Sequence, residues 1–171
     1  GNNGWDGIYI GESEDALVVG NTIGSGSIGN ESFGNGYSGI FIDNSQRAMI
    51  GGTDPSESNT IINSTYQGVS VVGASQGVAI IGNSIHNNSA FGIDLSQNGL
   101  TANDVLDIDT GPNNLLNFPD NLQYDVNGGN TDMTYTLDVP AGQYRVEFFS
   151  NTTADGSGYG EGQTYLASHD V

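Results

Sequence analysis

His86 and Asp94, eight positions apart, are the side chains in this sequence that most resemble an acid and base pair. Such a pair can transfer protons during hydrolysis when the two groups face each other. Asp43 and Asp94 offer a second arrangement, because a glycosidase uses two opposed carboxylates. Both aspartates belong to short Ile-rich segments, so their separation depends on how these segments are positioned by the fold.

These segments belong to an internal repeat. The form glycine, apolar, variable, apolar begins at four glycines, which are 32, 29 and 24 residues apart: Gly7, Gly39, Gly68 and Gly92. A second glycine series recurs with a constant spacing of 31 residues: Gly20, Gly51 and Gly82. Each run is rich in Ile and Val, has a period of two and ends in Gly, Asn or Ser, which is typical of a short strand.

Short strands that recur at this period predict an all-β chain wound as a solenoid with parallel sheets, of about four coils. The apolar positions are expected to stack inward in ladders with a rise of about 4.8 Å: Ile8, Ile40, Val69 and Ile93, and Ile10, Ile42, Val71 and Leu95. The Gly-Asn pairs at 20–21 and 82–83 fit sharp corners between sheets, because Gly and Asn tolerate positive φ. The longest corner loop, Gly24 to Ser38, is expected to be individual to this chain.

In this arrangement the proposed catalytic pairs are poorly placed. Asp43 and Asp94 are expected to lie two coils apart, about 10 Å, at or beyond the long end for an inverting glycosidase. His86 begins a corner, "HNNSA", and Asp94 lies on the strand that follows it. A solvated turn histidine is therefore the favoured interpretation, and Asp94 is expected to face outward.

The outward position of the first strand carries aromatic residues. Tyr9 and Phe41 occupy it in successive coils, with Trp5 close by. Exposed aromatic rings could bind sugar rings, so Trp5, Tyr9, Phe41, Asp43 and Asp94 form a candidate glycan site. The alternative is that Tyr9 and Phe41 pack on each other or under a loop.

An acidic cluster follows the repeats. Asp104, Asp107 and Asp109 alternate oxygen ligands before Gly111, as calcium loops do, although the twelfth-position glutamate of an EF-hand is missing. Calcium is the candidate cofactor. A network of Asx turns, with no ion, explains the same residues.

The net charge excludes some partners. The chain carries 20 carboxylates, no lysine and two arginines, Arg47 and Arg145, for a formal charge of −18. Such a surface repels phosphate, so we expect no nucleic-acid binding. No apolar run approaches the ~20 residues of a membrane-spanning helix, so we expect no direct membrane insertion.

Three strings carry a family resemblance: "IGNSI", "FGIDL" and "NDVLDIDTGPNNLLNFP" at 103–119. They resemble the right-handed parallel β-helix repeat proteins of large secreted and surface-anchored bacterial polypeptides. The string "VEFFSNTTADGSGYGEGQTYL" at 146–166 resembles the segment that often follows the helix in those proteins. The resemblance implies a β-helix module in a multidomain exported protein and no defined reaction. Lyases on this fold usually need a cationic base, and Arg47 is the sole basic residue of the repeats.

These observations give one domain plan and two functions. We expect parallel β-helix coils at 1–98, an Asn- and Asp-rich cap at 99–130 and an antiparallel β segment at 131–171, with a hairpin turn at 140–142. The favoured function is a non-enzymatic structural or adhesive module at the cell surface or outside the cell, part of a longer chain, that contacts a polysaccharide or cell-surface glycan. The alternative is a fragment of a carbohydrate-active β-helix enzyme, a polysaccharide hydrolase or lyase.

Overall fold

The computed structural model describes residues 2–26 and 33–171, so part of the predicted loop from Gly24 to Ser38 lies outside the described residues. The described chain is all-β, with parallel sheets in its first part and antiparallel pairs in its second. Two short 3-10 helices interrupt it, η1 (Pro55–Glu57) and η2 (Pro112–Leu115). Within these residues, no helix has the length and apolar character needed to span a membrane.

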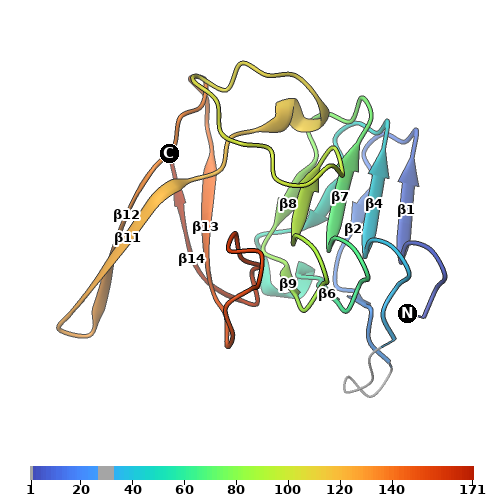
Figure 1. Ribbon diagram of the computed structural model, residues 1–171, viewed down its shortest axis with the longest axis horizontal. Coiled ribbons are helices and arrows are strands. Elements are labelled where there is room, and N and C mark those ends of the chain that lie inside the picture. Colours follow the sequence, from blue (N-terminus) through green and yellow to red (C-terminus); the bar gives the residue numbers. More distant parts are fainter. Residues whose placement is uncertain (1, 27–32) are drawn as a thin grey trace.

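Three parallel sheets are built from the repeats (Figure 1). The first contains β1 (Ile8–Gly11), β4 (Ile40–Asp43), β7 (Val69–Val72) and β10 (Ile93–Leu95). The second contains β2 (Leu17–Val18), β5 (Met49–Gly51) and β8 (Ala79–Ile81). The third contains β3 (Thr22–Ile23), β6 (Thr60–Ile62) and β9 (Ser84–His86). The chain therefore passes through the three sheets in the same order in the first three repeats, and the fourth repeat adds a strand to the first sheet.

Equivalent positions of the repeat pair with one another, as the sequence predicts. Ile8 pairs with Ile40, Ile40 with Val69 and Val69 with Ile93. The second apolar series is in the same register, and most members of both series belong to one buried core. Ile93 is an exception, since 46% of it is exposed. It forms the last rung of its ladder, with a strand on one side only.

Gly20 and Gly82 adopt the positive φ that was expected at their corners, and Gly51, for which no corner was predicted, adopts it as well. The φ angles of Gly20, Gly51 and Gly82 are 67°, 79° and 62°. At Gly51 a β-carbon would also lie 2.1 Å from the carbonyl oxygen of Ile81 in the next repeat. Both the positive φ and this close approach require glycine there.

The second part of the chain differs from the prediction. β11 (Asp120–Asn127) and β12 (Asn130–Thr136) form an antiparallel hairpin whose turn residues, Gly128 and Gly129, both have positive φ. β11 lies within the segment that was expected to be a polar cap. β13 (Arg145–Ser150) pairs with β14 (Thr164–Asp170), not with β12, so the predicted hairpin turn at 140–142 was wrong.

The sheet of β13 and β14 lies between the β11–β12 hairpin and the parallel sheets (Figure 1). On one side Tyr135 of the hairpin packs against Phe148, with ring centroids 5.8 Å apart, and shares a 2.9 Å hydrogen bond with His169. On the other side Glu147 of β13 accepts a 2.8 Å hydrogen bond from the Gly82 amide of the repeats. The far end of the hairpin projects away from the rest of the molecule.

Candidate functional site

The outward ladder of the first sheet has the predicted register but not the predicted exposure. Tyr9 pairs with Phe41, Phe41 with Ser70 and Ser70 with Asp94. Tyr9 and Phe41 stack with centroids 5.8 Å apart and planes 12° from parallel. The Tyr9 hydroxyl also donates to Asp43 at 3.2 Å. Because the rings stack along the ladder, each covers a face that a sugar would otherwise use.

A longer aromatic stack lies beside the start of the first sheet. Only its first member, Trp5, was predicted as a site residue. Trp5, Tyr37 and Tyr66 stack in series, with centroids 5.0 Å and 5.1 Å apart. All three are exposed, Trp5 by 71%. Each residue lies two positions before a repeat glycine, a signal that was available in the sequence. The stack ends at Ala90, the equivalent residue of the fourth repeat.

Asp94 does not face solvent, so that prediction was wrong. Only 3% of the residue is exposed. Its Oδ2 accepts hydrogen bonds from Gln67 at 3.0 Å and from the Gly99 amide at 3.1 Å. The segment after β10 therefore folds back over this carboxylate. Its Oδ1 is buried and has no hydrogen-bond partner within the described residues.

The paired carboxylates do not occupy equivalent positions. Asp43 pairs with Gly11 and Val72, one position beyond the ladder that contains Asp94. Arg47, the cation that a lyase would need, is held by two exposed ion pairs, to Asp15 at 2.7 Å and Glu14 at 3.0 Å. These contacts raise the pKa of the Arg47 guanidinium and hold it on the surface beside Asp15 and Glu14.

His86 lies at the end of β9, half-buried, and not in a solvated turn. Burial lowers the pKa of its imidazole, and its Nδ1 has no partner within the described residues. The carboxylate of Asp94 is bound instead to Gln67 and Gly99. An acid and base pair of His86 and Asp94 therefore has no support in these contacts.

The acidic cluster after the repeats is real. The ligand atoms of Asp104, Asp107 and Asp109 lie within 4.8 Å of one another. Asp107 is buried and accepts a 2.7 Å hydrogen bond from the Asn117 amide, while Asp104 accepts one from the Ile108 amide at 3.1 Å. Desolvation, followed by repulsion from its two neighbours, raises the pKa of Asp109. The cluster combines Asx-type hydrogen bonds with unrelieved negative charge.

Polar side chains at the corners of the repeats join one repeat to the next. At the corner between the second and third sheets, the backbone N–H of Asn21 donates to Asn59 Oδ1 at 3.0 Å. The backbone N–H of Asn59 donates in turn to Asn83 Oδ1 at 3.1 Å. Ser13, Ser45 and Ser75 form a similar series at another corner. Both series satisfy backbone donors that bend away from the sheets.

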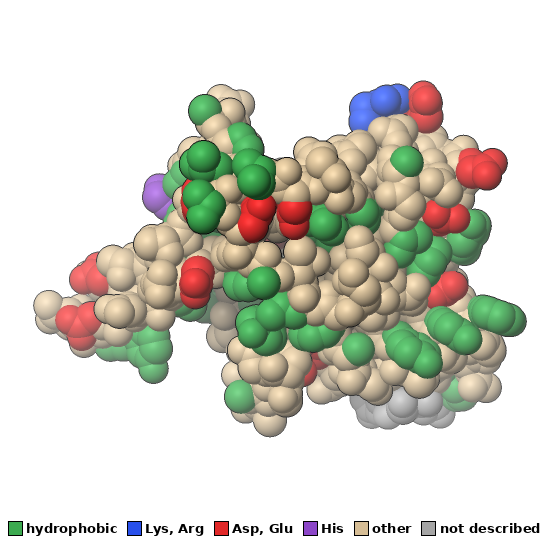
Figure 2. Space-filling view, turned by 45° about the horizontal axis from the view of Figure 1, so that its top comes forward, with side chains coloured by type: hydrophobic (Ala, Val, Ile, Leu, Met, Phe, Trp, Pro, Cys, Tyr) green, Lys and Arg blue, Asp and Glu red, His purple; other side chains and the backbone are tan. Residues whose placement is uncertain are grey.

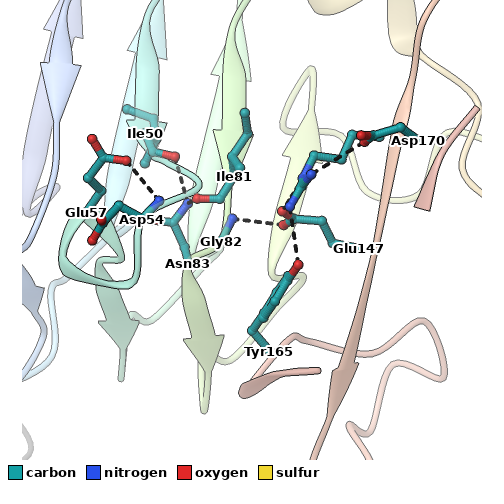
Figure 3. A network of polar contacts seen from close by, with 10 residues as sticks. Ile50, Asp54, Glu57, Ile81, Gly82, Asn83, Glu147, Tyr165 and Asp170 are labelled. Atoms are coloured by element: carbon teal, nitrogen blue, oxygen red, sulfur yellow. Dashed lines mark hydrogen bonds and ion pairs between the residues drawn. The ribbon is translucent and has the colours of Figure 1, made fainter. Parts of the chain in front are cut away.

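Residues from beyond the repeats form hydrogen bonds with the corners of the last repeat. Asn113 donates its amide to the Ser75 carbonyl at 2.8 Å. Glu147 accepts from the Gly82 amide at 2.8 Å (Figure 3), and its carboxylate also pairs with Arg145 at 3.0 Å. Glu161 accepts from the side chain of Asn88 at 2.9 Å. The predicted cap is therefore formed by three separate segments, two of them within 131–171.

Charge and apolar surface are distributed unevenly over the molecule. Carboxylates are scattered over the face shown in Figure 2, where a single basic group appears beside acidic ones, and hydrophobic side chains lie on both the main body and the projecting hairpin. No family model, no curated protein and no solved structure matches the chain.

Proposed function

We propose that the repeats form a right-handed parallel β-helix. The three parallel sheets and the constant order in which the chain visits them support this architecture. Connections between parallel strands of one sheet are right-handed in about 98% of proteins, because a right-twisted strand returns to its sheet most easily that way. The family resemblance of the repeat strings points to the same fold.

We propose further that this β-helix is a non-catalytic structural or adhesive module of a secreted or cell-surface protein. The observation that carries this proposal is the use of the polar side chains. Asn59, Asn83 and Asp94 are buried and hydrogen-bonded between repeats or to the segment that covers them. Groups committed in this way stabilise a stack and are not available to a substrate.

A catalytic assay tests this proposal. The protein is incubated with neutral and acidic polysaccharides, and reducing ends and unsaturated products are measured. We expect neither product above the level given by heat-denatured protein. Turnover that disappears in Asp94→Asn, while the variant keeps its thermal midpoint, would refute the structural role and restore the hydrolase or lyase fragment.

The exposed aromatic stack is the proposed glycan-contacting surface. Trp5, Tyr37 and Tyr66 present their ring edges at intervals of about 5 Å along one side of the repeats. An extended polysaccharide could lie along such a row and bury apolar sugar faces against it.

Binding to a glycan array tests the aromatic surface. We expect Trp5→Ala and Tyr66→Ala to weaken retention on any glycan that binds, because both remove exposed ring surface. Tyr124→Ala is the matched control, since Tyr124 is 74% exposed on the distant hairpin. Equal retention by all three variants would remove the aromatic stack from any glycan site.

Calcium is the proposed ligand of the acidic cluster. Three carboxylates with ligand atoms within 4.8 Å suit a hard cation that prefers oxygen, and a bound ion would relieve the repulsion on Asp109. Melting curves with EDTA and with millimolar calcium provide the test. We expect calcium to raise the midpoint of the protein but not that of Asp109→Asn. An unchanged midpoint in the unmodified protein would refute calcium binding.

A further inference from the structure

A cavity of about 650 Å³ lies between the last repeat and the segments that cover it. Its floor is the apolar end of the repeats, including Ile80, Ile85 and Leu95, and its walls come from 99–119 and 147–162. Ile93 also lines it, which explains why this residue stays exposed although its ladder is otherwise buried. The corner hydrogen bonds attach the covering segments at their margins and leave the centre open.

Three aromatic side chains from separate segments meet in this cavity. Tyr159 lies 6.3 Å from Phe91 and 6.1 Å from Phe118, measured between ring centroids. The planes meet at 60° and 74°, so the rings are set at steep angles and do not stack on one another. The three rings therefore line the cavity from different directions, unlike the nearly parallel rings on the first sheet.

The charged groups that line the cavity are all acidic. Asp94, Glu147 and Glu161 belong to the lining, and no lysine or arginine does within the described residues. Only 3% of Asp94 is exposed, and its Oδ1 has no hydrogen-bond partner among the described residues. Glu161 lies over Gly92, two residues before Asp94, and burial raises the pKa of its carboxyl. Glu147 is paired with Arg145, so the negative charge that no basic side chain offsets within the described residues comes from Asp94 and Glu161, beside apolar and aromatic walls.

This combination selects between classes of ligand. An anion such as a fatty acid, a phosphate or a uronate would meet three carboxylates and no basic side chain in the described lining. A purely apolar molecule would leave the buried acidic groups uncompensated. A cation held over aromatic faces gains both cation–π attraction and the field of the carboxylates, while an apolar body fills the remaining volume.

We propose that the cavity at the end of the repeats binds an organic ammonium ion with an apolar body. The ammonium group lies among Phe91, Phe118 and Tyr159, and the apolar body lies on the exposed end of the repeats. This site is separate from the aromatic stack and from the acidic cluster of the proposed function. It does not depend on glycan or calcium binding.

Matched probes test the charge requirement. Ligand-observed NMR titrations at 0.15 M NaCl, where the Debye length is about 8 Å, reduce general attraction to the acidic surface. Benzyltrimethylammonium and choline are the cationic probes, 3,3-dimethylbutan-1-ol is the neutral isostere of choline, and benzoate is the anion. We expect choline to bind at least about 10-fold more tightly than its isostere, benzyltrimethylammonium more tightly than choline, and benzoate not to bind.

Variants then locate the binding. Tyr159→Leu is expected to weaken the binding of benzyltrimethylammonium about 2- to 30-fold, the range given by a cation–π contact of about 0.5–2 kcal/mol. Tyr124→Leu, on the projecting hairpin, is the matched control and should bind as the unmodified protein does. Glu161→Gln keeps an oxygen acceptor for Asn88 and should weaken the cations but not the neutral isostere.

Three results would overturn the proposal. The first is equal affinity for choline and its isostere, which would indicate a merely apolar cavity. The second is an equal effect of Tyr159→Leu and Tyr124→Leu, which would place the cation elsewhere on the acidic surface. The third is no detectable binding of either cation by a protein whose melting curve is normal.

Discussion

Replacement of Asn59 by alanine tests whether the corner hydrogen bonds hold the repeats together. The side chain is fully buried, and its Nδ2 donates to the Val18 carbonyl and to Asn83 Oδ1, both at 2.8 Å. Its Oδ1 accepts a hydrogen bond from the backbone N–H of Asn21 at 3.0 Å. One side chain thus connects three consecutive repeats, since these partners lie 41, 24 and 38 residues away along the chain.

The expected loss of stability follows from the groups left behind. Asn59→Ala removes the side-chain donor to the buried Val18 carbonyl, at a cost of about 1–3 kcal/mol, and the acceptor of the Asn21 amide, at about 1 kcal/mol. The total is about 2–4 kcal/mol. With an m-value of about 1–3 kcal/mol/M, urea unfolding should show a midpoint lower by roughly 1 M or more.

Asn21→Ala is the matched control for this measurement. Asn21 is exposed, and its side chain donates to the Val19 carbonyl and to Asn59, so water replaces most of what is lost. We expect a cost below about 1 kcal/mol. If Asn59→Ala lowers the urea midpoint no more than Asn21→Ala does, with m unchanged in both, the corner series does not hold the repeats together.

Three further predictions follow from burial, ring stacking and protonation. Ile42→Ala should lower the free energy of unfolding in urea by about 2–5 kcal/mol, because Ile42 is fully buried. Leu17→Ala, at an exposed position, should change it little. Similar losses in the two variants would contradict the assignment of Ile42 to the core. Tyr37→Ala interrupts two ring contacts and Trp5→Ala one, so Tyr37→Ala should be the more destabilising by about 0.5–1.5 kcal/mol, and the reverse order would show that the stack adds no stability. Burial raises the folded-state pKa of Glu161, so the folded protein binds more protons than the unfolded chain between the two pKa values, and stability falls as pH rises from about 4.5 through the raised value. Glu161→Gln should make the pH dependence of the melting midpoint less negative in that window, and parallel curves would contradict this assignment.

The C-terminal part of the chain shows how far local signals reach. The strands β12, β13 and β14 contain the β-branched and aromatic residues that are typical of strands. The pairing of these strands could not be predicted in the same way. Pro140 to Gly142 has the composition of a hairpin turn, yet β13 pairs with β14, across a longer loop. Turn composition indicates where a chain can bend, whereas pairing depends on which strands meet after it has bent.

The burial of the candidate site residues could not be predicted from the local sequence either. Tyr9, Phe41, Ser70 and Asp94 share one position in the repeat, yet Tyr9 is 61% exposed and Asp94 only 3%. The difference arises because a segment outside the repeat, at Gly99, covers one end of the ladder. A periodic pattern assigns equivalent positions to equivalent faces and contains no information about what later covers them.

The sequence by itself determined the all-β character, the positions of the repeating strands, their register and the corner glycines. These features are set by local periodicity and by the φ values that only glycine adopts easily, and a repeated chain presents the same solution in each repeat. Only the tertiary structure decided which groups close the end of the repeats. Glu147 and Glu161 reach Gly82 and Asn88 from 65 and 73 residues away, and no periodicity connects such positions. The cavity between them, with its aromatic and acidic lining, exists because these distant segments attach at the corners of the last repeat and not at its apolar centre.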